Sequence, residues 1–375
     1  MIYLDNSATT NIKPKEVIKA MSSAFTKFTA NPGRSGHKLA IDTSMQVEQI
    51  RQDIAEYLNA QNVVFTAGCT DALNLALLGT MKEGGHIVIS SNDHNASARP
   101  IFEMHKKYGT EVSVATPKSP EILTLDDILP HIKKNTYLVC VNHMSNVDGA
   151  IADIKSIGEY CEENNILFCV DGAQSAGHLD LDMHKNYIDL LALAPHKGLY
   201  SPQGVGMLCF SKRSKLKPIR FGGTGTESES VYQPTSGIES FESGTLATPN
   251  ILGLGAGLQF VKQNFEKINS KIDDLGTYLN YELSNTSGVK VYTHPNNSFG
   301  IIAFNIRDYG STEVSQMLSD RYQICTRGGL HCAALKHQAL NTTMQGIVRA
   351  SLGYFNTFSD CTKLVKAVKE IARQN

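Results

Sequence analysis

Short apolar runs rich in β-branched residues recur along the first two thirds of the chain, with amphipathic segments between them. Seven of these runs predict strands, at residues 62–66, 86–90, 111–115, 136–142, 166–171, 188–193 and 205–210. The patterns at 96–109 and 152–165 are typical of helices between strands. Strands that alternate with helices predict an α/β fold, with a mostly parallel sheet covered on both faces.

The pattern changes after about residue 250, where a long helical stretch leads into further strands and helices. We therefore expect a large domain at residues 15–255 and a smaller α+β domain built from residues 1–14 and 256–375. The run "GLGAGL" at 253–258 lacks the spacing and the preceding strand of a dinucleotide fingerprint. Small residues that let this helix pack closely are the better interpretation.

Composition narrows the classes of ligand. The chain has 375 residues, 41% of them hydrophobic, and a formal charge of −1. This balance gives no reason to expect nucleic acid or an anionic membrane as a partner, so a small molecule is the default ligand. The N-terminus lacks the pattern of a signal peptide and no apolar run has the length of a membrane helix, which predicts a cytoplasmic protein.

Polar residues follow the predicted strands at the carboxyl ends, where open parallel sheets bind ligands. Gly68, Cys69 and Thr70 follow the first strand and open a helix whose N–H groups suit an anion such as phosphate. Taken alone, this pattern fits a plain threonine N-cap better. His94 and Asn146 follow two further strands.

Asp171 and Lys197 end two successive strands and together point to pyridoxal 5'-phosphate. That cofactor needs a lysine for its Schiff base and an acid that keeps its pyridine nitrogen protonated. Thr70 and His196 could hold its phosphate, and His94 could stack on its ring. The alternative is that Lys197 is one surface lysine among many.

The loop "RGGLHCAALKH" at 327–337 carries Cys332 beside His331. Its spacing alone does not decide whether Cys332 is a metal ligand, a nucleophile or a packing residue. None of the eight cysteines forms a C-x-x-C pair, so a structural zinc ribbon and a thioredoxin-like redox pair are not indicated.

Nine motifs, in order over essentially the whole chain, resemble the class V aminotransferase superfamily and, within it, the NifS-like cysteine desulfurase and selenocysteine lyase family. They are "YLDNSATT", "TAGCTDALNLA", "SNDHNAS", "SNVDGAI", "VDGAQSAGH", "HKGLYSPQGVG", "FESGT", "RGGLHCA" and "VRASLGYFNT". The resemblance implies a homodimeric pyridoxal phosphate enzyme of fold type I.

The resemblance also assigns roles to individual residues. Lys197 matches the Schiff-base lysine, Asp171 the acid at the pyridine nitrogen, and His94 the imidazole stacked on the ring. The remaining positions that match cofactor-binding or substrate-binding groups are Cys69 (through its backbone), Thr70, Gln174, His196, Asn146, Arg327 and Arg349. Thr226 matches a position that completes the phosphate site of the neighbouring subunit.

Cys332 matches the cysteine that accepts sulfur in this family, with Arg327 and His331 expected as positive neighbours that favour its thiolate. The implied reaction converts L-cysteine to L-alanine and leaves a persulfide on Cys332, for delivery to a small sulfur-acceptor protein. L-Selenocysteine is an alternative substrate. Two rival interpretations stay open: an aminotransferase or β-lyase in which Cys332 is a bystander, and a scaffold or sulfur carrier without turnover.

Overall fold

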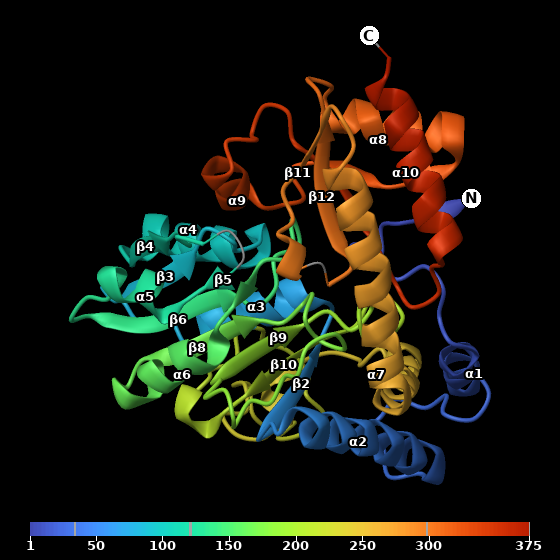
Figure 1. The fold of residues 1–375 in the computed structure, drawn as a ribbon. Helices are drawn as coiled ribbons and strands as arrows, with labels where there is room; N and C mark the ends of the chain where they lie inside the picture. Colours follow the sequence, from blue (N-terminus) through green and yellow to red (C-terminus); the bar gives the residue numbers. More distant parts are fainter. Residues whose placement is uncertain (34, 120–121, 298, 375) are drawn as a thin grey trace.

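The computed structural model describes residues 1–33, 35–119, 122–297 and 299–374. Figure 1 shows a central sheet flanked by helices and, beside it, a smaller sheet covered by the C-terminal helices. The long helix α7 runs from one part to the other. The architecture is α/β, as the alternation of strands and helices predicts.

The large sheet has seven strands in the spatial order β2-β10-β9-β8-β6-β3-β4. Their bounds are β2 (Asn62–Thr66), β3 (His86–Ser90), β4 (Glu111–Ala115), β6 (Thr136–Asn142), β8 (Leu167–Asp171), β9 (Leu190–Leu193) and β10 (Gly206–Phe210). β10 is antiparallel to both of its neighbours, and all other pairs are parallel. The seven predicted strands and the mostly parallel sheet are therefore confirmed.

Helices bury both faces of this sheet. In β6, Val139 and Val141 face a core shared with α2, α6 and α7, whereas Leu138 and Cys140 face a core shared with α3 and α4. The bounds of these helices are α2 (Lys38–Leu58), α3 (Cys69–Gly79), α4 (Asn95–Tyr108), α6 (Ile154–Glu163) and α7 (Thr248–Ser284). Burial on both sides explains why the strands read as continuous apolar runs.

Helix α7 is a single helix of 37 residues, and the glycines of "GLGAGL" lie in its first half. A Cβ atom at Gly255 would lie 2.7 Å from the side chain of Ile50, and one at Gly257 would lie 2.3 Å from the carbonyl oxygen of Leu199. The glycines thus allow α7 to approach α2 and the turn that follows β9. The helix-packing interpretation is confirmed.

The C-terminal part is built on an antiparallel sheet in the order β11-β12-β15-β14. Its elements are β11 (Val289–Val291), β12 (Ile301–Ile306), α8 (Ser311–Tyr322), β14 (Arg327–Gly329), α9 (Ala334–Ala339), β15 (Ile347–Ser351) and α10 (Phe358–Ala372). The start of the chain joins this part, because β1 (Ile2–Tyr3) pairs with β13 (Ile324–Cys325).

The remaining elements are short connections or lie on the outside of the fold. They are α1 (Lys15–Ala24), β5 (Ile122–Leu123), α5 (Leu125–Ile128), β7 (Ile151–Ala152) and the 3-10 turns η1 (Leu129–His131), η2 (Lys212–Ser214), η3 (Ile238–Phe241) and η4 (Pro295–Asn297). Within the described ranges, no helix combines the length and apolar character needed to cross a membrane.

Candidate active site

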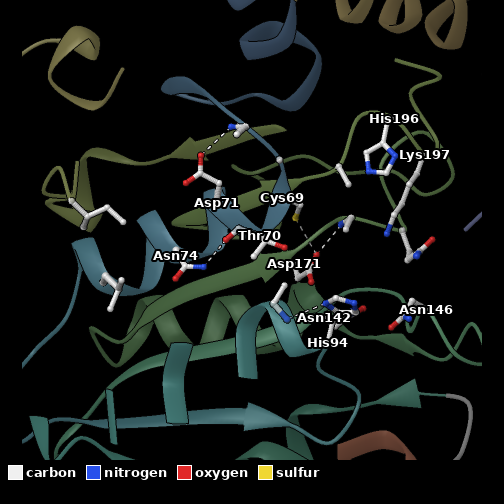
Figure 2. Close-up of a pocket in the computed structure, with 18 of the residues that line it drawn as sticks. Cys69, Thr70, Asp71, Asn74, His94, Asn142, Asn146, Asp171, His196 and Lys197 are labelled. Carbon is white, nitrogen blue, oxygen red and sulfur yellow. Dashed lines mark hydrogen bonds between the residues drawn. The ribbon is translucent and has the colours of Figure 1, made fainter. Parts of the chain in front are cut away.

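A cavity of about 780 Å³ opens at the carboxyl ends of the parallel strands (Figure 2). Eight of the residues singled out from the sequence line it, namely Cys69, Thr70, His94, Asn146, Asp171, Gln174, His196 and Lys197. Asp171 ends β8, and the others come from the segments that follow β2, β3, β6, β8 and β9. The expected convergence of strand ends is therefore observed.

Lys197 lies in the turn after β9, and its side chain points into the cavity (Figure 2). Burial lowers the pKa of Lys197, while the nearby Asp171 opposes this shift. Within the described part of the chain, its Nζ has no hydrogen-bond or ion-pair partner. An amine with a lowered pKa and no partner is suited to covalent chemistry and proton transfer. The alternative of an ordinary surface lysine is wrong, because this side chain is inside the cavity.

Asp171 is the last residue of β8, and its side chain is only 2% exposed. Its Oδ1 accepts a hydrogen bond from the backbone N–H of Ala173 at 2.9 Å and from the Cys69 thiol at 3.7 Å. Burial raises the pKa of Asp171, and the Ala173 N–H and Lys197 counteract this effect. The pKa of the Cys69 thiol is raised well above its ordinary value, first by burial and then by Asp171. Cys69 is thus a neutral thiol that donates to the carboxylate.

Helix α3 begins at the edge of the cavity with Gly68 as its N-cap, and no side chain caps it. Thr70 lies inside the first turn, so the alternative of a plain threonine N-cap is wrong. A Cβ at Gly206 would lie 2.2 Å from the carbonyl carbon of Gly68, so glycine is required where β10 passes this helix start. The first N–H groups of α3 remain available for an anion.

His94 is the N-cap of α4, and its Nδ1 accepts a hydrogen bond from the backbone N–H of Ala96 at 3.0 Å. Because Nδ1 is the acceptor, Nε2 carries the proton. Burial, followed by the charges of Lys197 and Arg327, lowers the pKa of His94 to about 4. The imidazole at the cavity wall is therefore neutral at physiological pH, and its orientation is fixed by the helix start.

Several donors converge on the peptide that precedes Lys197. The carbonyl oxygen of His196 accepts hydrogen bonds from the Thr10 N–H, the hydroxyls of Thr9 and Thr10, and Nζ of Lys13, at 3.0 to 3.2 Å. The ring Nδ1 of His196 is buried and has no hydrogen-bond partner among the residues that the structure describes. Burial lowers the pKa of this ring to about 4, so it is neutral as well. The N-terminal segment thus fixes the backbone that carries Lys197.

The same segment reaches two of the predicted ligand-binding residues. Gln174 donates from Nε2 to the carbonyl oxygen of Ser7 at 3.0 Å. Arg349 is almost fully buried, and its guanidinium donates to Asp5 Oδ1 and to the carbonyl oxygen of Asn146, both at 2.7 Å. Its Nε is buried, and no described residue accepts a hydrogen bond from it. The contacts with Asp5 and Asn146 use two of the five guanidinium N–H groups, so the buried cation keeps donors for a carboxylate ligand.

Cys332 lines a second cavity, of about 560 Å³, which adjoins the first along α4 and shares Thr70 and His94 with it. The Cys332 side chain is exposed. Its carbonyl oxygen accepts a hydrogen bond from the backbone N–H of Asn95 at 2.7 Å. The loop that carries the thiol is therefore attached to the start of the helix that His94 caps.

Two further contacts shape the Cys332 loop. Asn146 donates from Nδ2 to the carbonyl oxygen of His331 at 2.8 Å, and Arg327 places Nη2 3.9 Å from the sulfur of Cys332. His331 and Cys332 have φ values of 49° and 55°, a region that residues with side chains adopt rarely. The surrounding hydrogen bonds hold this turn in place.

The expectation that His331 is a positive neighbour of Cys332 is wrong. Its Nε2 lies 2.9 Å from the carbonyl oxygen of Ile347, so this nitrogen carries a proton and donates it. Burial, followed by the charge of Arg349, lowers the pKa of His331 to about 2. The ring is therefore neutral, and Arg327 is the cation that contacts the thiol.

Thr226 is not brought to the cavity by its own chain. It lies on an exposed loop that lines a separate cavity with Arg51 and Glu242. This position is compatible with the expectation that Thr226 serves a neighbouring subunit, which remains a prediction.

Sequence reasoning missed several residues of the site. Asn142 and Arg220 line the cavity, and Arg220 forms an ion pair with Asp71 in the first turn of α3. Asp5, the partner of Arg349, stands in the motif "YLDNSATT", so its acidic side chain in that motif was the available signal. No local pattern distinguished Arg220 from other exposed arginines.

Known proteins are similar in sequence to this chain over nearly its whole length. The family model described as Aminotransferase class-V matches residues 2–364. A probable cysteine desulfurase from Methanothermobacter thermautotrophicus is 32% identical, over 99% of this chain and 94% of the relative. One from Pyrococcus abyssi is 30% identical, over 100% of this chain and 94% of the relative.

Solved structures of cysteine desulfurases are similar in fold to this chain. A cysteine desulfurase from Thermococcus onnurineus, solved in its apo form, superposes with a TM-score of 0.92 at 29% identity and covers 99% of this chain and 94% of its own. A cysteine desulfurase from Escherichia coli superposes with a TM-score of 0.87 at 27% identity, over 98% and 94% of the two chains. The chain therefore belongs to the class V aminotransferase family, with cysteine desulfurases among its relatives.

Proposed function

We propose that this protein is a pyridoxal phosphate-dependent cysteine desulfurase that converts L-cysteine to L-alanine and transfers the sulfur to Cys332. The observation that carries the proposal is the pairing of two cavities. One contains the partner-free amine of Lys197 near the buried Asp171, and the adjoining one is lined by the thiol of Cys332. The names of the relatives support the same activity.

The residues of the cavity fit pyridoxal phosphate. Lys197 offers a free amine to the aldehyde, Asp171 offers a buried carboxylate to the ring nitrogen, and the start of α3 offers N–H groups to the phosphate. The buried polar atoms of the described residues that have no hydrogen-bond partner include Asn146 Oδ1 and His196 Nδ1, on residues that line the cavity, and Nε of Arg349, which contacts Asn146. When bound, the cofactor supplies an electron sink for charge that develops at the substrate Cα.

Individual side chains of this protein would bind the substrate, transfer the proton at Cα and accept the sulfur. Arg349 would bind the substrate carboxylate through N–H groups that its contacts with Asp5 and Asn146 leave free, and neutral His94 would pack on the ring of the cofactor. The amine of Lys197, whose pKa is lowered by burial, removes and returns the proton at Cα. The thiolate of Cys332, beside Arg327, attacks the substrate sulfur, so that an S–S bond forms as the C–S bond breaks. The products are alanine and a persulfide on Cys332.

The finer assignments belong to the same proposal. We infer a fold type I enzyme with a large domain at residues 15–255 and a small domain at 1–14 and 256–375. It would act as a homodimer in which Thr226 completes the phosphate site of the other subunit. A small thiol-bearing protein would take up the sulfur, and L-selenocysteine would be a second substrate.

The experiment is to incubate the purified protein with pyridoxal phosphate and L-cysteine and to quantify the amino-acid product. We expect alanine in the wild type, and none in Lys197→Ala. Lys133→Ala is the matched control, because Lys133 is a half-exposed lysine paired with Glu111 on the surface. Pyruvate or another keto acid in place of alanine would show a lyase or an aminotransferase. Absence of any product would favour a scaffold.

A further inference from the structure

Lys336 is a buried lysine that the proposed reaction does not use. It lies on α9, four residues after Cys332, and its side chain is about 5% exposed. Its Nζ is 2.7 Å from Asp148 Oδ2 and 2.9 Å from Asn92 Oδ1. Asp148 and Asn92 are both 2% exposed. The contact is therefore a fully desolvated ion pair with one additional hydrogen bond.

The partners of Lys336 stand in the two turns that carry site residues. Asn92 comes two residues before His94, in the turn after β3, and its N–H donates to Ser90 Oγ at 3.0 Å. Asp148 comes two residues after Asn146, in the turn after β6. Lys336 thus joins the segment after Cys332 to the two turns from which His94 and Asn146 reach the cavity.

The Cys332 loop needs such an attachment. Helix α9 has only six residues, a length at which a helix is not stable by itself. The positive φ values of His331 and Cys332 are costly and persist only when the surrounding structure imposes them. The contacts of Asn95 and Asn146 hold the loop at Cys332 and before it, and Lys336 holds it on the other side.

Stability alone is a weak reason for this pair. The free energy lost when an ammonium and a carboxylate are desolvated is about as large as the free energy gained from their attraction. A protein with apolar residues in their place is often equally stable. What an ion pair adds over an apolar contact is a defined geometry. Lys336 follows Cys332, and its partners Asp148 and Asn92 lie in the turns that carry Asn146 and His94, so the geometry that this contact defines is the position of the Cys332 loop.

We propose that Lys336 is a positioning residue that holds the Cys332 thiol in the cavity adjoining that of Lys197, through its contacts with Asp148 and Asn92. The inference rests on the proposed function, because it concerns the cysteine that accepts the sulfur. Loss of the contact would leave the cofactor site complete and displace only the nucleophile. A displacement of about 1 Å can lower a rate on the order of 100-fold.

The test compares Lys336→Met with the double variant Lys336→Met/Asp148→Asn. The single variant leaves a buried carboxylate unpaired, whereas the double variant removes that charge and should recover the melting temperature. We expect kcat for alanine formation to fall on the order of 10- to 100-fold in both variants, with KM for cysteine and the visible spectrum of the bound cofactor unchanged. Recovery of both melting temperature and kcat in the double variant would overturn the proposal in favour of a purely structural role.

Hydrogen exchange provides a readout that does not depend on turnover. Amides of residues 330–340 should exchange faster in both variants than in the wild type, while those of β8 stay protected. Arg213→Met is the matched control, because it breaks the pair with the buried Asp189 away from the cavity. Unchanged exchange in residues 330–340 would overturn the inference. A wild-type protein that forms no alanine would refute the proposed function instead and leave this exchange test intact.

Discussion

Replacement of Asp171 by asparagine tests the electrostatics of the cavity. The side chain is 2% exposed, and asparagine keeps its shape and the oxygen that accepts from the Ala173 N–H. The substitution therefore removes one buried negative charge and little else. It takes away the carboxylate that we propose as the partner of the cofactor's ring nitrogen, and the group that opposes the lowering of the Lys197 pKa.

The expected magnitude follows from the burial of this carboxylate. Water does not replace a charge at a site that is 2% exposed, and loss of one partner of a buried charge pair costs about 2 to 5 kcal/mol. Because about 1.36 kcal/mol corresponds to a tenfold change in rate, kcat should fall about 30- to 5000-fold. The pKa of Lys197 should fall further, because Asp171 acts to raise it.

The assay is alanine release at saturating cysteine, together with competitive labelling of Lys197 against pH in cofactor-free protein. Asp189→Asn is the control, because Asp189 is also buried but pairs with Arg213 and lines a different cavity. This control should lower the melting temperature and leave kcat unchanged. A kcat of Asp171→Asn within threefold of the wild type would refute the reasoning.

Three further predictions concern stability and substrate binding. Asp5→Asn weakens the contact that orients Arg349, so KM for cysteine should rise and the free energy of unfolding should fall by about 1.5 to 3 kcal/mol. An unchanged KM would contradict this role of Asp5. Burial lowers the pKa of His143 from 6.5 to about 4, so the unfolded chain binds more protons between these pH values. The protein therefore loses stability as pH falls through this window. In His143→Gln, the free energy of unfolding measured by urea titration should depend less steeply on pH. Gly257→Ala would put a methyl group 2.3 Å from a backbone oxygen and should cost about 1 to 3 kcal/mol in the same titration. An unchanged free energy of unfolding would contradict the tight approach of α7 at this residue.

Much of the fold could be predicted because each strand is buried on both faces and reads as a continuous apolar run. The carboxyl-end rule for parallel sheets then indicated where Asp171 and Lys197 would meet, and the cavity contains both. The antiparallel direction of β10 had no such signal, since a five-residue strand between two turns reads the same in either direction.

The details that sequence reasoning missed depend on tertiary environment. His331 stands beside Arg327 in a loop and resembles a possible cation, but its ring is enclosed and donates to a backbone carbonyl, so it stays neutral. Lys336 appears in the sequence as an ordinary lysine, and only the fold brings Asp148 to it from almost 190 positions away. Burial and long-range pairing of this kind leave no local pattern.

The most direct test of the central claim is the fate of sulfur on Cys332→Ala. With L-cysteine, we expect wild-type protein to form alanine and to gain the mass of one sulfur atom at Cys332, while the variant does neither and keeps the cofactor spectrum. With L-selenocysteine, the variant should still form alanine, because the weaker C–Se bond lets selenium depart as Se(0) and leave its bonding electrons on the carbon, which is then protonated, without a protein nucleophile. Cys325→Ala is the matched control, because Cys325 is a free cysteine of intermediate exposure, and it should behave as the wild type. Full alanine formation from L-cysteine by Cys332→Ala would contradict the assignment of Cys332 as the sulfur acceptor.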